Sequence, residues 1–563
     1  MIEPIGHTAR RMNIRESLTS VNNTSFELSS QGASDVLVTF GTETGNSESV
    51  ALQLAQKLHE NGVPYKVSSL AELKPRALSR TDYLLLICST HGDGDPPEPA
   101  LPFYESLMET DVNLTKLKYA VLALGDSTYD YFCETGLRLD KRLASLGGKR
   151  LAERYDCDVD FEKISNDWIQ HIVKLIPRTE VKPDFKVPNA LTRETPPTND
   201  CLYTKQNLLH TQVLENVCLS SAQRRRPYHH IELAVEPRTF SISPGDAIGL
   251  IPKNPEWLID NILSATHLSG DEQVSLNGET FTLKKGLSEH LDLNIPSPGF
   301  LNLWASLSKD SFLLEQTDSN IRTQRTFLKT QQIIWLMEQY PGRPTAQALV
   351  DSLRPLQPRL YDVANYISSD SDEIHITVKD FHYSLNQKSL QGIASQHLLQ
   401  LQPGDEVRIY PHTNKRFHLP ENTGTPVILI AYGTGIAPYK AFMEKIEESE
   451  IANPCWLIFG EQHFEEDFLY QIFWQHAESK GILQHTDTVF YQGQTNRQLS
   501  DPLIEKFERL VEWLIRGAHI YLCGEKDILA LCEKNLETHY NTRFGSTSWK
   551  MLTATKRIHR NLY

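Results

Sequence analysis

Residues 36–62 read VLVTFGTETGNSESVALQLAQKLHENG. The segment joins a short apolar run, typical of a buried strand, to a hydroxyl- and glycine-rich loop and then to apolar residues at helical spacing. The alternation continues through YKVSSL (65–70), YLLLICST (83–90), LPFYESLMET (101–110) and YAVLALGD (119–126), with a further helix expected near Thr135. This βαβ series predicts a doubly wound parallel sheet, with helices on both faces and a ligand site in the loops beyond the carboxyl ends of its strands.

The rest of the chain changes pattern. Residues 178–205 are rich in proline and polar residues without a regular period, so we expect an interdomain linker there. From about residue 206 the strand-like segments predict an antiparallel barrel, which a helical insertion at about 254–350 interrupts. From residue 424 onward, alternating strands and helices return. The chain is therefore expected to be a multidomain α/β protein.

Length and composition bound the function. A chain of 563 residues exceeds what one hydrophobic core supports, so roughly three or four domains are expected. The 71 acidic residues outnumber the 56 basic ones, and the charge of −15 disfavours nucleic acid or a membrane surface as partner. The eight cysteines form no CxxC pair, so we interpret them as reduced thiols of a cytoplasmic protein with no iron-sulfur cluster and no metal.

Three loops at strand ends have the composition of a ligand site. TETGNS (42–47) opens a helix, whose free N–H groups favour a phosphate, although helix capping explains this loop equally well by itself. STHGDGDPPE (89–98) supplies glycines for close backbone approach to a ring. LGDSTYDYFC (124–133) supplies aromatic side chains for stacking. Together the loops favour a phosphorylated aromatic ligand.

In this order and spacing, the loops resemble the FMN site of flavodoxins and of the diflavin reductase family. The resemblance implies that residues 42–47 hold the FMN phosphate and that His91 and Tyr129 flank the isoalloxazine ring. The full set it implies for FMN is Thr42, Glu43, Thr44, Gly45, Asn46, Ser47, Ser89, Thr90, His91, Gly92, Leu124, Gly125, Asp126, Ser127, Thr128, Tyr129, Asp130, Tyr131, Phe132 and Cys133. Acidic residues near the ring edge, Asp93, Asp95, Glu98 and Asp130, either dock a basic electron acceptor or are simply solvated.

Later motifs point to a second flavin and a nicotinamide nucleotide. In PRLYDVANY (358–366), Arg359 can pair with a pyrophosphate and Tyr361 offers a ring face. The motifs that follow are TVKDFHY (377–383), GIAS (392–395), YGTGIAPY (432–439) and YLCGE (521–525). Their order resembles the FAD and NADPH modules of ferredoxin reductases. LRPLQPRLY (353–361), GEQHFEEDFLYQIFWQ (460–475), RGAHIYLCGE (516–525) and the final Tyr563 resemble the sulfite reductase flavoproteins in particular.

This second resemblance implies site residues position by position. Tyr361 and Tyr563 would cover the two faces of the flavin, and Cys523 would lie beside the nicotinamide. A C-terminal aromatic lid has to move before the nicotinamide can stack. The implied FAD residues are Arg359, Leu360, Tyr361, Asp362, Thr377, Val378, Lys379, Tyr383, Gly392, Ile393, Ala394, Ser395 and Tyr563. The implied NADP residues are Gly433, Thr434, Gly435, Tyr491, Gln492, Arg497, Leu499 and Cys523, and the implied catalytic residues are Cys523, Asp362, Asn561 and Tyr563.

The resemblance also implies an organisation and an activity. The expected parts are a flavodoxin-like FMN domain (34–177), the linker (178–205), an FAD-binding barrel with its helical insertion (206–423) and a Rossmann-like NADP-binding domain (424–563). By composition, residues 1–33 are expected to be a mobile leader, with a weak targeting segment as the alternative. Electrons would pass from NADPH through FAD to FMN, and then to a separate haem and iron-sulfur subunit that reduces sulfite to sulfide. The sequence leaves open whether the chain forms a homo-oligomer.

The chain departs from the family pattern near the reacting atoms. Asp362 stands where the family usually has Ser, and Asn561 where it usually has Asp. We hypothesise that the carboxylate that stabilises a developing nicotinamide cation has moved to the other side of the site. A weakened hydride site explains the two changes equally well.

Other departures concern the nucleotide. Tyr491-Gln492 and Arg497-Gln498-Leu499 replace the Ser-Arg and Lys-x-Tyr pairs that grip the 2′-phosphate, which leaves one cation and makes NADH a possible donor. His418 replaces a frequent Arg, and Ala431-Tyr432 replaces Gly-Pro. Two other functions therefore stay open: a diflavin reductase for another acceptor, or an FMN carrier or assembly subunit whose nicotinamide module has decayed.

Overall fold

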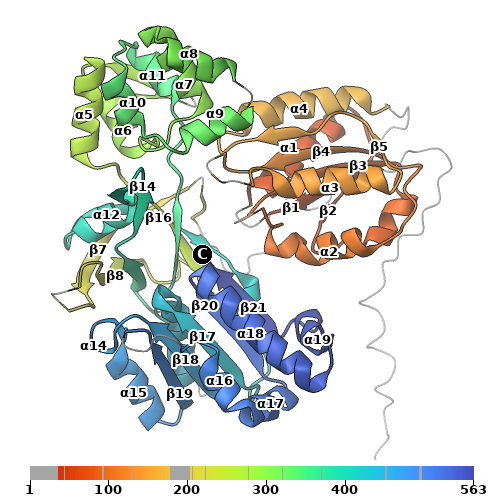
Figure 1. Ribbon diagram of the computed structural model, residues 1–563, viewed down its shortest axis with the longest axis vertical. Helices are drawn as coiled ribbons and strands as arrows, with labels where there is room; N and C mark the ends of the chain where they lie inside the picture. The colour runs from red at the N-terminus through yellow and green to blue at the C-terminus, as the bar shows by residue number, and fades with distance from the viewer. Residues whose placement is uncertain are drawn as a thin grey trace, which may run out of the picture.

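A computed structural model describes residues 36–42, 45–91, 94–127, 129, 131–177, 203–205, 207–221, 224–276, 278–319, 321–368, 370–449, 453–492 and 497–563. Outside these ranges lie the expected leader, residues 178–202 of the expected linker, and the predicted FMN residues Glu43, Thr44, Gly92, Thr128 and Asp130. Figure 1 shows the arrangement of the described parts, with the C-terminus lying centrally, where the parts meet.

The N-terminal module (residues 36–177) is a parallel sheet between two layers of helices. Its strands are β1 (Val36–Gly41), β2 (Tyr65–Ser69), β3 (Tyr83–Ser89), β4 (Lys118–Leu124), β5 (Lys149–Arg150) and β6 (Tyr155–Cys157), in the order β2-β1-β3-β4-β5 with β6 also paired to β4. Helices α1 (Asn46–Glu60) and α4 (Glu162–Leu175) cover one face, and α2 (Leu101–Glu109) and α3 (Glu134–Ser145) cover the other. Because both faces are covered, the central strand β3 is apolar almost throughout. The expected doubly wound sheet is confirmed.

The barrel module is a six-stranded antiparallel sheet. Its strands run in the order β12 (Arg359–Asp362), β9 (Ala247–Ile251), β16 (Glu406–His412), β7 (Leu209–Cys218), β8 (Tyr228–Ala234) and β13 (Glu373–Lys379). An isolated antiparallel bridge between Val363 and Ile376 links the two ends of the sheet, which brings it toward closure. Alternate residues point inward and form one apolar cluster. The hairpin β14 (His382–Leu385) and β15 (Lys388–Gln391) precedes helix α12 (Ile393–Gln400).

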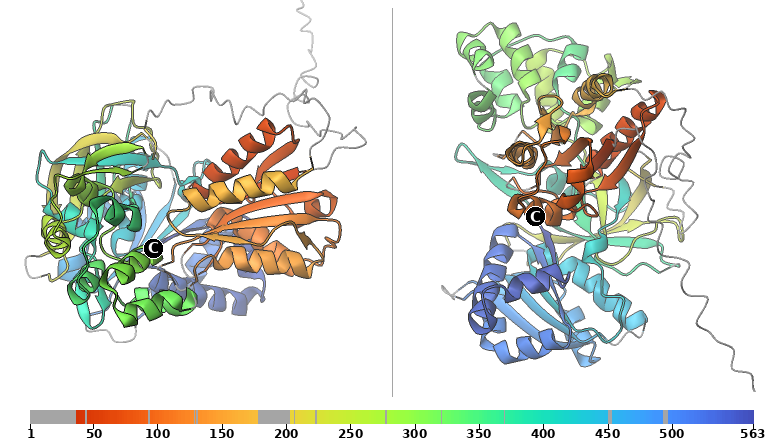
Figure 2. Two further views of the ribbon diagram at one scale, coloured as in Figure 1. Left: turned by 90° about the horizontal axis from the view of Figure 1, so that it is seen from above. Right: turned by 90° about the vertical axis from the view of Figure 1, so that its right-hand side faces the viewer.

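The helical module lies between β9 and β12 in the chain. It contains α5 (Glu256–Thr266), the hairpin β10 (Gln273–Leu276) and β11 (Glu279–Thr282), α6 (Leu283–Glu289), α7 (Pro298–Ser308), α8 (Ser311–Asp318), α9 (Ile321–Leu328), α10 (Ile333–Gln339) and α11 (Ala346–Ser352). These elements share one apolar core that includes the buried Trp304 and Phe300. Figure 2 shows the helical module and the N-terminal module on neighbouring sides of the molecule.

The C-terminal module is a parallel sheet in the order β19 (Leu483–Phe490), β18 (Cys455–Glu461), β17 (Val427–Tyr432), β20 (His519–Gly524) and β21 (Ile558–Leu562). Its helices are α13 (Ala437–Glu448), α14 (Phe464–Asp467), α15 (Gln471–Ser479), α16 (Asp501–Glu505), α17 (Phe507–Ile515), α18 (Lys526–Phe544) and α19 (Ser548–Ala554). The order reverses beside β17, so a ligand is expected beyond the carboxyl ends of β17 and β20.

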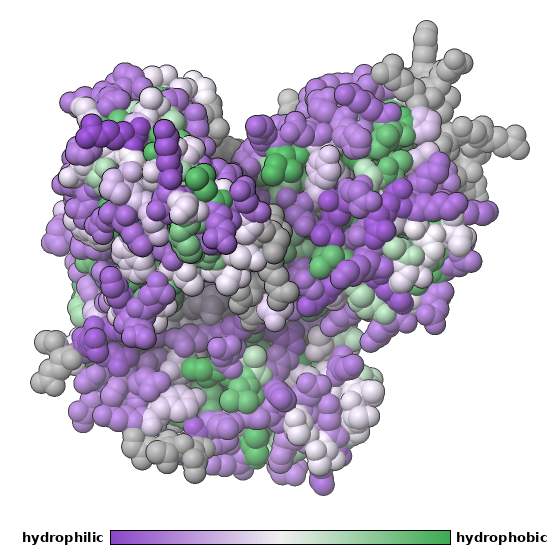
Figure 3. Space-filling model, turned by 45° about the horizontal axis from the view of Figure 1, so that its top comes forward, coloured by the Kyte–Doolittle hydropathy of each residue, from purple (hydrophilic) through white to green (hydrophobic). Residues whose placement is uncertain are grey.

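The surface shows no broad apolar area on the face in Figure 3, where hydrophobic residues form small separate patches among hydrophilic ones. Among the described residues, no helix combines the length and the apolar character needed to cross a membrane.

Candidate active site

Three of the four predicted catalytic residues meet where the barrel and C-terminal modules join. Asp362 ends β12, Cys523 lies near the end of β20, and Asn561 lies on β21. The Cys523 thiol donates to Asp362 Oδ2 at 3.5 Å, and the Asn561 amide donates to Asp362 Oδ1 at 2.8 Å. The Asn561 amide nitrogen also lies 3.6 Å from Cys523 Sγ. One carboxylate is thus held by two donors from the neighbouring module.

The protonation of this cluster is set by burial. Burial raises the pKa of Asp362 to about 6, against the opposing effect of the hydrogen bonds from Asn561 and Cys523. Burial and the nearby Asp362 carboxylate raise the pKa of the Cys523 thiol well above its usual value. At neutral pH the cluster therefore contains a carboxylate beside a protonated thiol, and the negative charge lies on the barrel side of the junction.

A tight glycine turn brings the chain against this cluster. The turn Gly433–Ile436 follows β17, and a Cβ atom at Gly435 would lie 1.9 Å from the Cys523 carbonyl oxygen. Gly524 has a φ of 127°, and a Cβ there would lie 2.3 Å from the Tyr432 carbonyl oxygen. Only glycine fits these two positions. The Thr434 hydroxyl lies 2.9 Å from the hydroxyl of Tyr563, whose side chain is 55% exposed at the mouth of the site.

The first loop of the N-terminal module has polar atoms that fit a phosphate. Thr42 Oγ1 and Ser47 Oγ are buried and lack a hydrogen-bond partner within the described residues. Both lie at the N-terminus of α1, a 15-residue helix preceded by Gly45 at a φ of 83°. Buried hydroxyls without partners are uncommon, and free N–H groups and the helix dipole at the same place favour an anion. This loop therefore fits the FMN phosphate.

The second and third loops lie at the same edge of the sheet. His91 and Asp95 exchange backbone hydrogen bonds of 2.8 and 3.0 Å, which close the second loop into a tight turn. Ser127 of the third loop donates its backbone N–H to Asp158 Oδ1 at 2.9 Å. Tyr129 and Tyr131 are 57% and 47% exposed, so their rings are accessible for stacking on a flavin.

The predicted FAD residues fall into two groups. Arg359 is exposed, and Ser395 lies in the first turn of α12, where its hydroxyl accepts from the Phe381 N–H at 3.2 Å. Tyr383 reaches the helical module through a 3.0 Å hydrogen bond from Gln332. By contrast, the side chain of Val378 lies in the barrel core, and those of Thr377 and Lys379 contact Tyr470 and Glu525 of the C-terminal module. This second group leaves only backbone atoms for a flavin.

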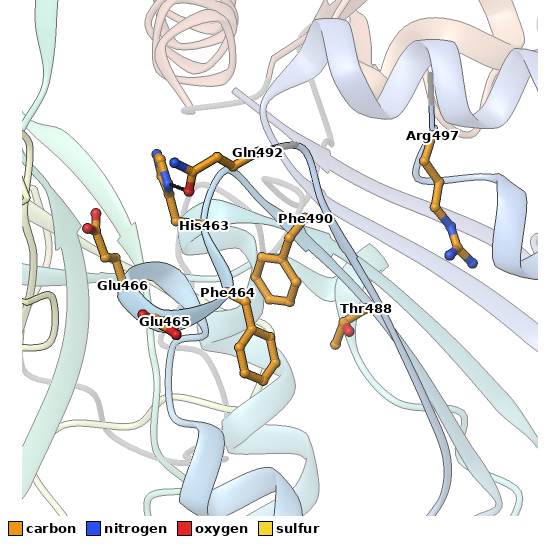
Figure 4. A pocket seen from close by; sticks show the side chains of 8 residues that line it. All are labelled: His463, Phe464, Glu465, Glu466, Thr488, Phe490, Gln492 and Arg497. Atoms are coloured by element: carbon orange, nitrogen blue, oxygen red, sulfur yellow. Dashed lines mark hydrogen bonds between the residues drawn. The ribbon is translucent and has the colours of Figure 1, made fainter. Parts of the chain in front are cut away.

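The predicted 2′-phosphate residues also separate. A cavity of about 540 Å³ is lined by His463, Phe464, Glu465, Glu466, Thr488, Phe490, Gln492 and Arg497. Figure 4 shows these side chains. Gln492 and Arg497 therefore share one pocket, whereas Leu499 is buried in the core of the module and Tyr491 packs against that core. The Arg497 guanidinium pairs with Glu505 at 3.1 Å. With two glutamates in its lining, the pocket is a weak electrostatic match for a phosphate.

Comparison with known proteins agrees with this geometry. A flavodoxin family model matches residues 38–168, an FAD-binding domain model matches 203–397 and an oxidoreductase NAD-binding domain model matches 429–534. The sulfite reductase [NADPH] flavoprotein alpha-component of Bacillus subtilis is 33% identical over 503 residues, covering 88% of this chain and 82% of that protein. The proteins of that name from Shewanella oneidensis and Buchnera aphidicola are 33% and 31% identical, covering 95% and 96% of this chain and 90% and 92% of theirs.

The chain belongs to the family of the sulfite reductase flavoprotein alpha-components. The predicted family is thereby confirmed. The FAD-binding model covers Asp362 and the NAD-binding model covers Cys523, so the junction that these two residues form lies between two matched regions.

Sequence reasoning missed a cluster of cations at this site. A second cavity, of about 390 Å³, is lined by Arg224, Arg225, Arg226, Lys379, Tyr432, Glu461, Gln462 and Glu525. It adjoins the glycine turn at 433–436, because Tyr432 lines it. The run of three arginines at 224–226 was a visible signal, but its position in a barrel loop gave no reason to connect it with a nucleotide bound to another module.

Arg354 was missed as well. It is 5% exposed, and its guanidinium lies 3.2 Å from Asp126 and 3.9 Å from Asp158 of the N-terminal module, and 3.4 Å from Asp292 of the helical module. Asp126 follows β4 in the third predicted FMN loop. The arginine precedes the R-x-Y motif by a few residues, but nothing in its local sequence indicates a partner from the N-terminal module.

Proposed function

We propose that the chain is the flavoprotein subunit of a sulfite reductase, which carries electrons from NADPH through FAD to FMN. The observation that carries this proposal is the joint site of Asp362, Cys523 and Asn561, because it unites a barrel strand with the ligand-binding edge of the C-terminal sheet. Bound flavins supply the redox chemistry, since their rings accept a hydride and release single electrons.

The chain's own residues hold the ligands. Thr42, Ser47 and the start of α1 bind the FMN phosphate, and Tyr129 with His91 flanks its ring. Arg359 and the start of α12 bind the FAD pyrophosphate, while Tyr361 and Tyr563 cover the flavin. Support comes from the unpartnered hydroxyls of the first loop and from the exposure of Arg359 and Tyr563. The domain boundaries at 34–177, 206–423 and 424–563 then each enclose one ligand, in agreement with the order of the family models.

The nucleotide lies across the C-terminal edge of the last sheet. The glycine turn at 433–435 approaches its phosphates. Arg225 and Arg226 of the second cavity add positive charge beside that turn, while Arg224 pairs with Glu461 and Asp467. Cys523 lies beside the nicotinamide. Asp362 supplies the carboxylate that faces the positive charge developing on the nicotinamide ring, and the Asn561 amide holds that carboxylate in place.

The final acceptor is a separate haem and iron-sulfur subunit. This part rests on the name of the relatives, which describes an alpha-component of a sulfite reductase. The acidic balance of the chain, −15 in all, suits a partner with a basic docking surface.

Flavin analysis followed by anaerobic titration tests the proposal. We expect the purified chain to hold one FMN and one FAD. NADPH should reduce both flavins. The matched variant Thr42→Val should lower FMN content and leave FAD content unchanged. A chain that retains FMN alone and does not oxidise NADPH would instead be an electron carrier. Two reducible flavins without electron transfer to a sulfite-reducing haem subunit would indicate another acceptor.

A further inference from the structure

A cluster of histidine and carboxylate side chains lies outside the active site, where the barrel module meets the C-terminal module. His230 and Glu232 lie on β8, and His375 lies opposite Glu232 on the paired strand β13. The alternate residues of both strands, such as Ile231 and Ile376, point into the barrel core. Strand alternation therefore turns the two histidines and the glutamate outward together, toward the neighbouring module.

The ligand atoms of this cluster are close to the spacing of a metal site. His230 Nε2 lies 3.2 Å from Glu232 Oε1, and His375 Nε2 lies 3.8 Å from the same oxygen. One ligand atom from each of the three side chains lies within 4.8 Å of the others. Two ligands bound at about 2.0–2.1 Å to a tetrahedral ion are roughly 3.3–3.4 Å apart. Small side-chain rotations are enough to bring these atoms to that spacing.

The two imidazoles are in the protonation state that binds metal. Burial lowers the pKa of His230 to about 4, and burial together with His230 and Lys440 lowers that of His375 to about 3. Both rings are therefore neutral at pH 7. The Tyr470 hydroxyl lies 3.0 Å from His230 Nδ1 and fixes that ring from the C-terminal module, while His375 Nδ1 is buried without a partner in the described part of the chain. A ring whose Nδ1 is engaged by such a partner offers Nε2 to a metal.

The charge around the cluster also favours a cation. Glu373 and Glu215 lie near Glu232 and raise its pKa together with burial, and Lys440 opposes them. The Lys440 ammonium is bound by Glu444 and by the Ala364 carbonyl oxygen, the latter at 3.2 Å. A divalent ion between the histidines would relieve the repulsion among the carboxylates. Glu373 Oε1 lies 2.9 Å from His375 Nε2 and adds negative charge beside the three ligands.

We propose that His230, His375 and Glu232 form a binding site for a zinc-class divalent metal ion at the seam between the barrel and C-terminal modules. The ion would replace the protons that link these nitrogens and oxygens in the metal-free protein. Its place between two barrel strands, with Tyr470 of the next module as an outer partner, makes it a structural clamp on this junction. The sequence alone gives no sign of it, because the two histidines lie on different strands far apart in the chain.

Zinc binding to the full-length, flavin-containing protein tests the proposal. The background variant is Cys218→Ser, because Cys218 is an exposed free thiol that can bind zinc. After removal of metal with a chelator, we expect about one equivalent of Zn²⁺ to bind and to raise Tm by at least about 2 °C. His375→Gln and Glu232→Gln should each weaken binding about tenfold or more, and Tyr470→Phe should weaken it less.

A matched control separates this site from general histidine binding. His229→Gln changes the neighbouring residue on β8, whose ring instead contacts Asn216 Oδ1 at 2.7 Å, and it should leave zinc affinity unchanged. Flavin content and far-UV circular dichroism report folding of each variant independently of metal. Failure of the background protein to bind zinc, or equal affinity in the His375, Glu232 and His229 variants, would overturn the proposal. NADPH oxidation is not part of the readout, so the electron-transfer function and the metal site stand or fall separately.

Discussion

Two junctions hold this molecule together, and they are built from different interactions. Between the barrel and C-terminal modules, Tyr228 and Phe417 are completely buried in one apolar cluster with Phe442 and Tyr521. The N-terminal module instead contacts the helical and C-terminal modules through ion pairs. Arg354 reaches Asp126 at 3.2 Å, and Lys526 reaches Asp95 at 3.4 Å. The first junction resembles the interior of a domain, and the second resembles a transient interface.

The difference follows from how each interaction responds to solvent. Apolar burial is not screened by salt, whereas ion pairs between modules weaken as ionic strength rises. The proposed hydride site takes Asp362 from one module and Cys523 from the other, so the proposal requires a permanent junction between these modules. The FMN module, in the proposed relay, has to face FAD at one time and a separate subunit at another. A junction of a few ion pairs, whose groups water can solvate once the modules separate, permits that exchange.

The largest expected effect comes from a cavity in the apolar junction. Phe417→Ala should lower the free energy of unfolding by about 3–5 kcal/mol, because a fully buried ring is lost from a packed cluster. Urea unfolding followed by FAD release measures this. Phe312→Ala is the matched control, since Phe312 is 44% exposed, and its cost should stay below about 1 kcal/mol. Equal costs would contradict the interpretation of this junction as an interior.

The charged junction should respond to Arg354→Met by opening rather than by unfolding. Removal of the guanidinium leaves Asp126, Asp158 and Asp292 without their shared cation, and separation lets water solvate them. We expect the docking of the N-terminal module to become less favourable by about 2–3 kcal/mol. Small-angle scattering should then show a larger radius of gyration at constant flavin content.

Lys526→Met is the control for this change. The Lys526–Asp95 pair is exposed, so its loss should change the free energy of docking by less than about 1 kcal/mol. Salt near 0.5 M should weaken the exposed Lys526–Asp95 pair more than the buried contacts of Arg354, so it should open the wild-type protein less than Arg354→Met does. A docked Arg354→Met protein at low salt would show that other contacts carry the junction.

This contrast also separates what the sequence predicts from what it does not. The strands of the N-terminal module and the loops at its ligand edge follow from local apolar runs and loop composition, as β3 illustrates. The meeting of Asp362 with Cys523 and Asn561 was expected only through family resemblance. Arg354 and the cluster around His375 were missed, because their partners come from other modules or distant strands and leave no periodic signal.

Asp362→Asn tests the junction between the barrel and C-terminal modules through a smaller change in stability. Because the pKa of Asp362 is raised to about 6 in the folded state, the folded protein holds this proton more tightly than the unfolded chain. The free energy of unfolding of the wild type therefore falls as pH rises from about 4 to about 6, and it stays at this lower value above pH 6. Asp362→Asn should be about 1–3 kcal/mol more stable than wild type at pH 8, and about equal to it at pH 4.

The same substitution, although it stabilises the fold, should slow the reduction of FAD by NADPH. In stopped-flow experiments at pH 8, FAD reduction by NADPH should fall about tenfold or more, because the charge facing the nicotinamide is lost. Wild-type rates should also fall below pH 6, as Asp362 takes up a proton, and the variant should lack this pH dependence. Unchanged rates in both Asp362→Asn and Asp362→Ser would refute a catalytic role for this carboxylate.

The smallest expected effect lies away from both junctions, in the pocket of Figure 4. Gln492→Arg places a guanidinium beside Arg497, which Glu505 already neutralises in part. The ratio of kcat/KM for NADPH to that for NADH should rise about 10–100-fold, because a charge-assisted contact with the 2′-phosphate is worth roughly 1.5–3 kcal/mol. Gln475→Arg, on the exposed side of α15, should leave the ratio unchanged. If Gln492→Arg changes kcat/KM for NADPH and for NADH by the same factor, the 2′-phosphate does not bind in this pocket. The arginines at 224–226 then become the candidates for nucleotide selection.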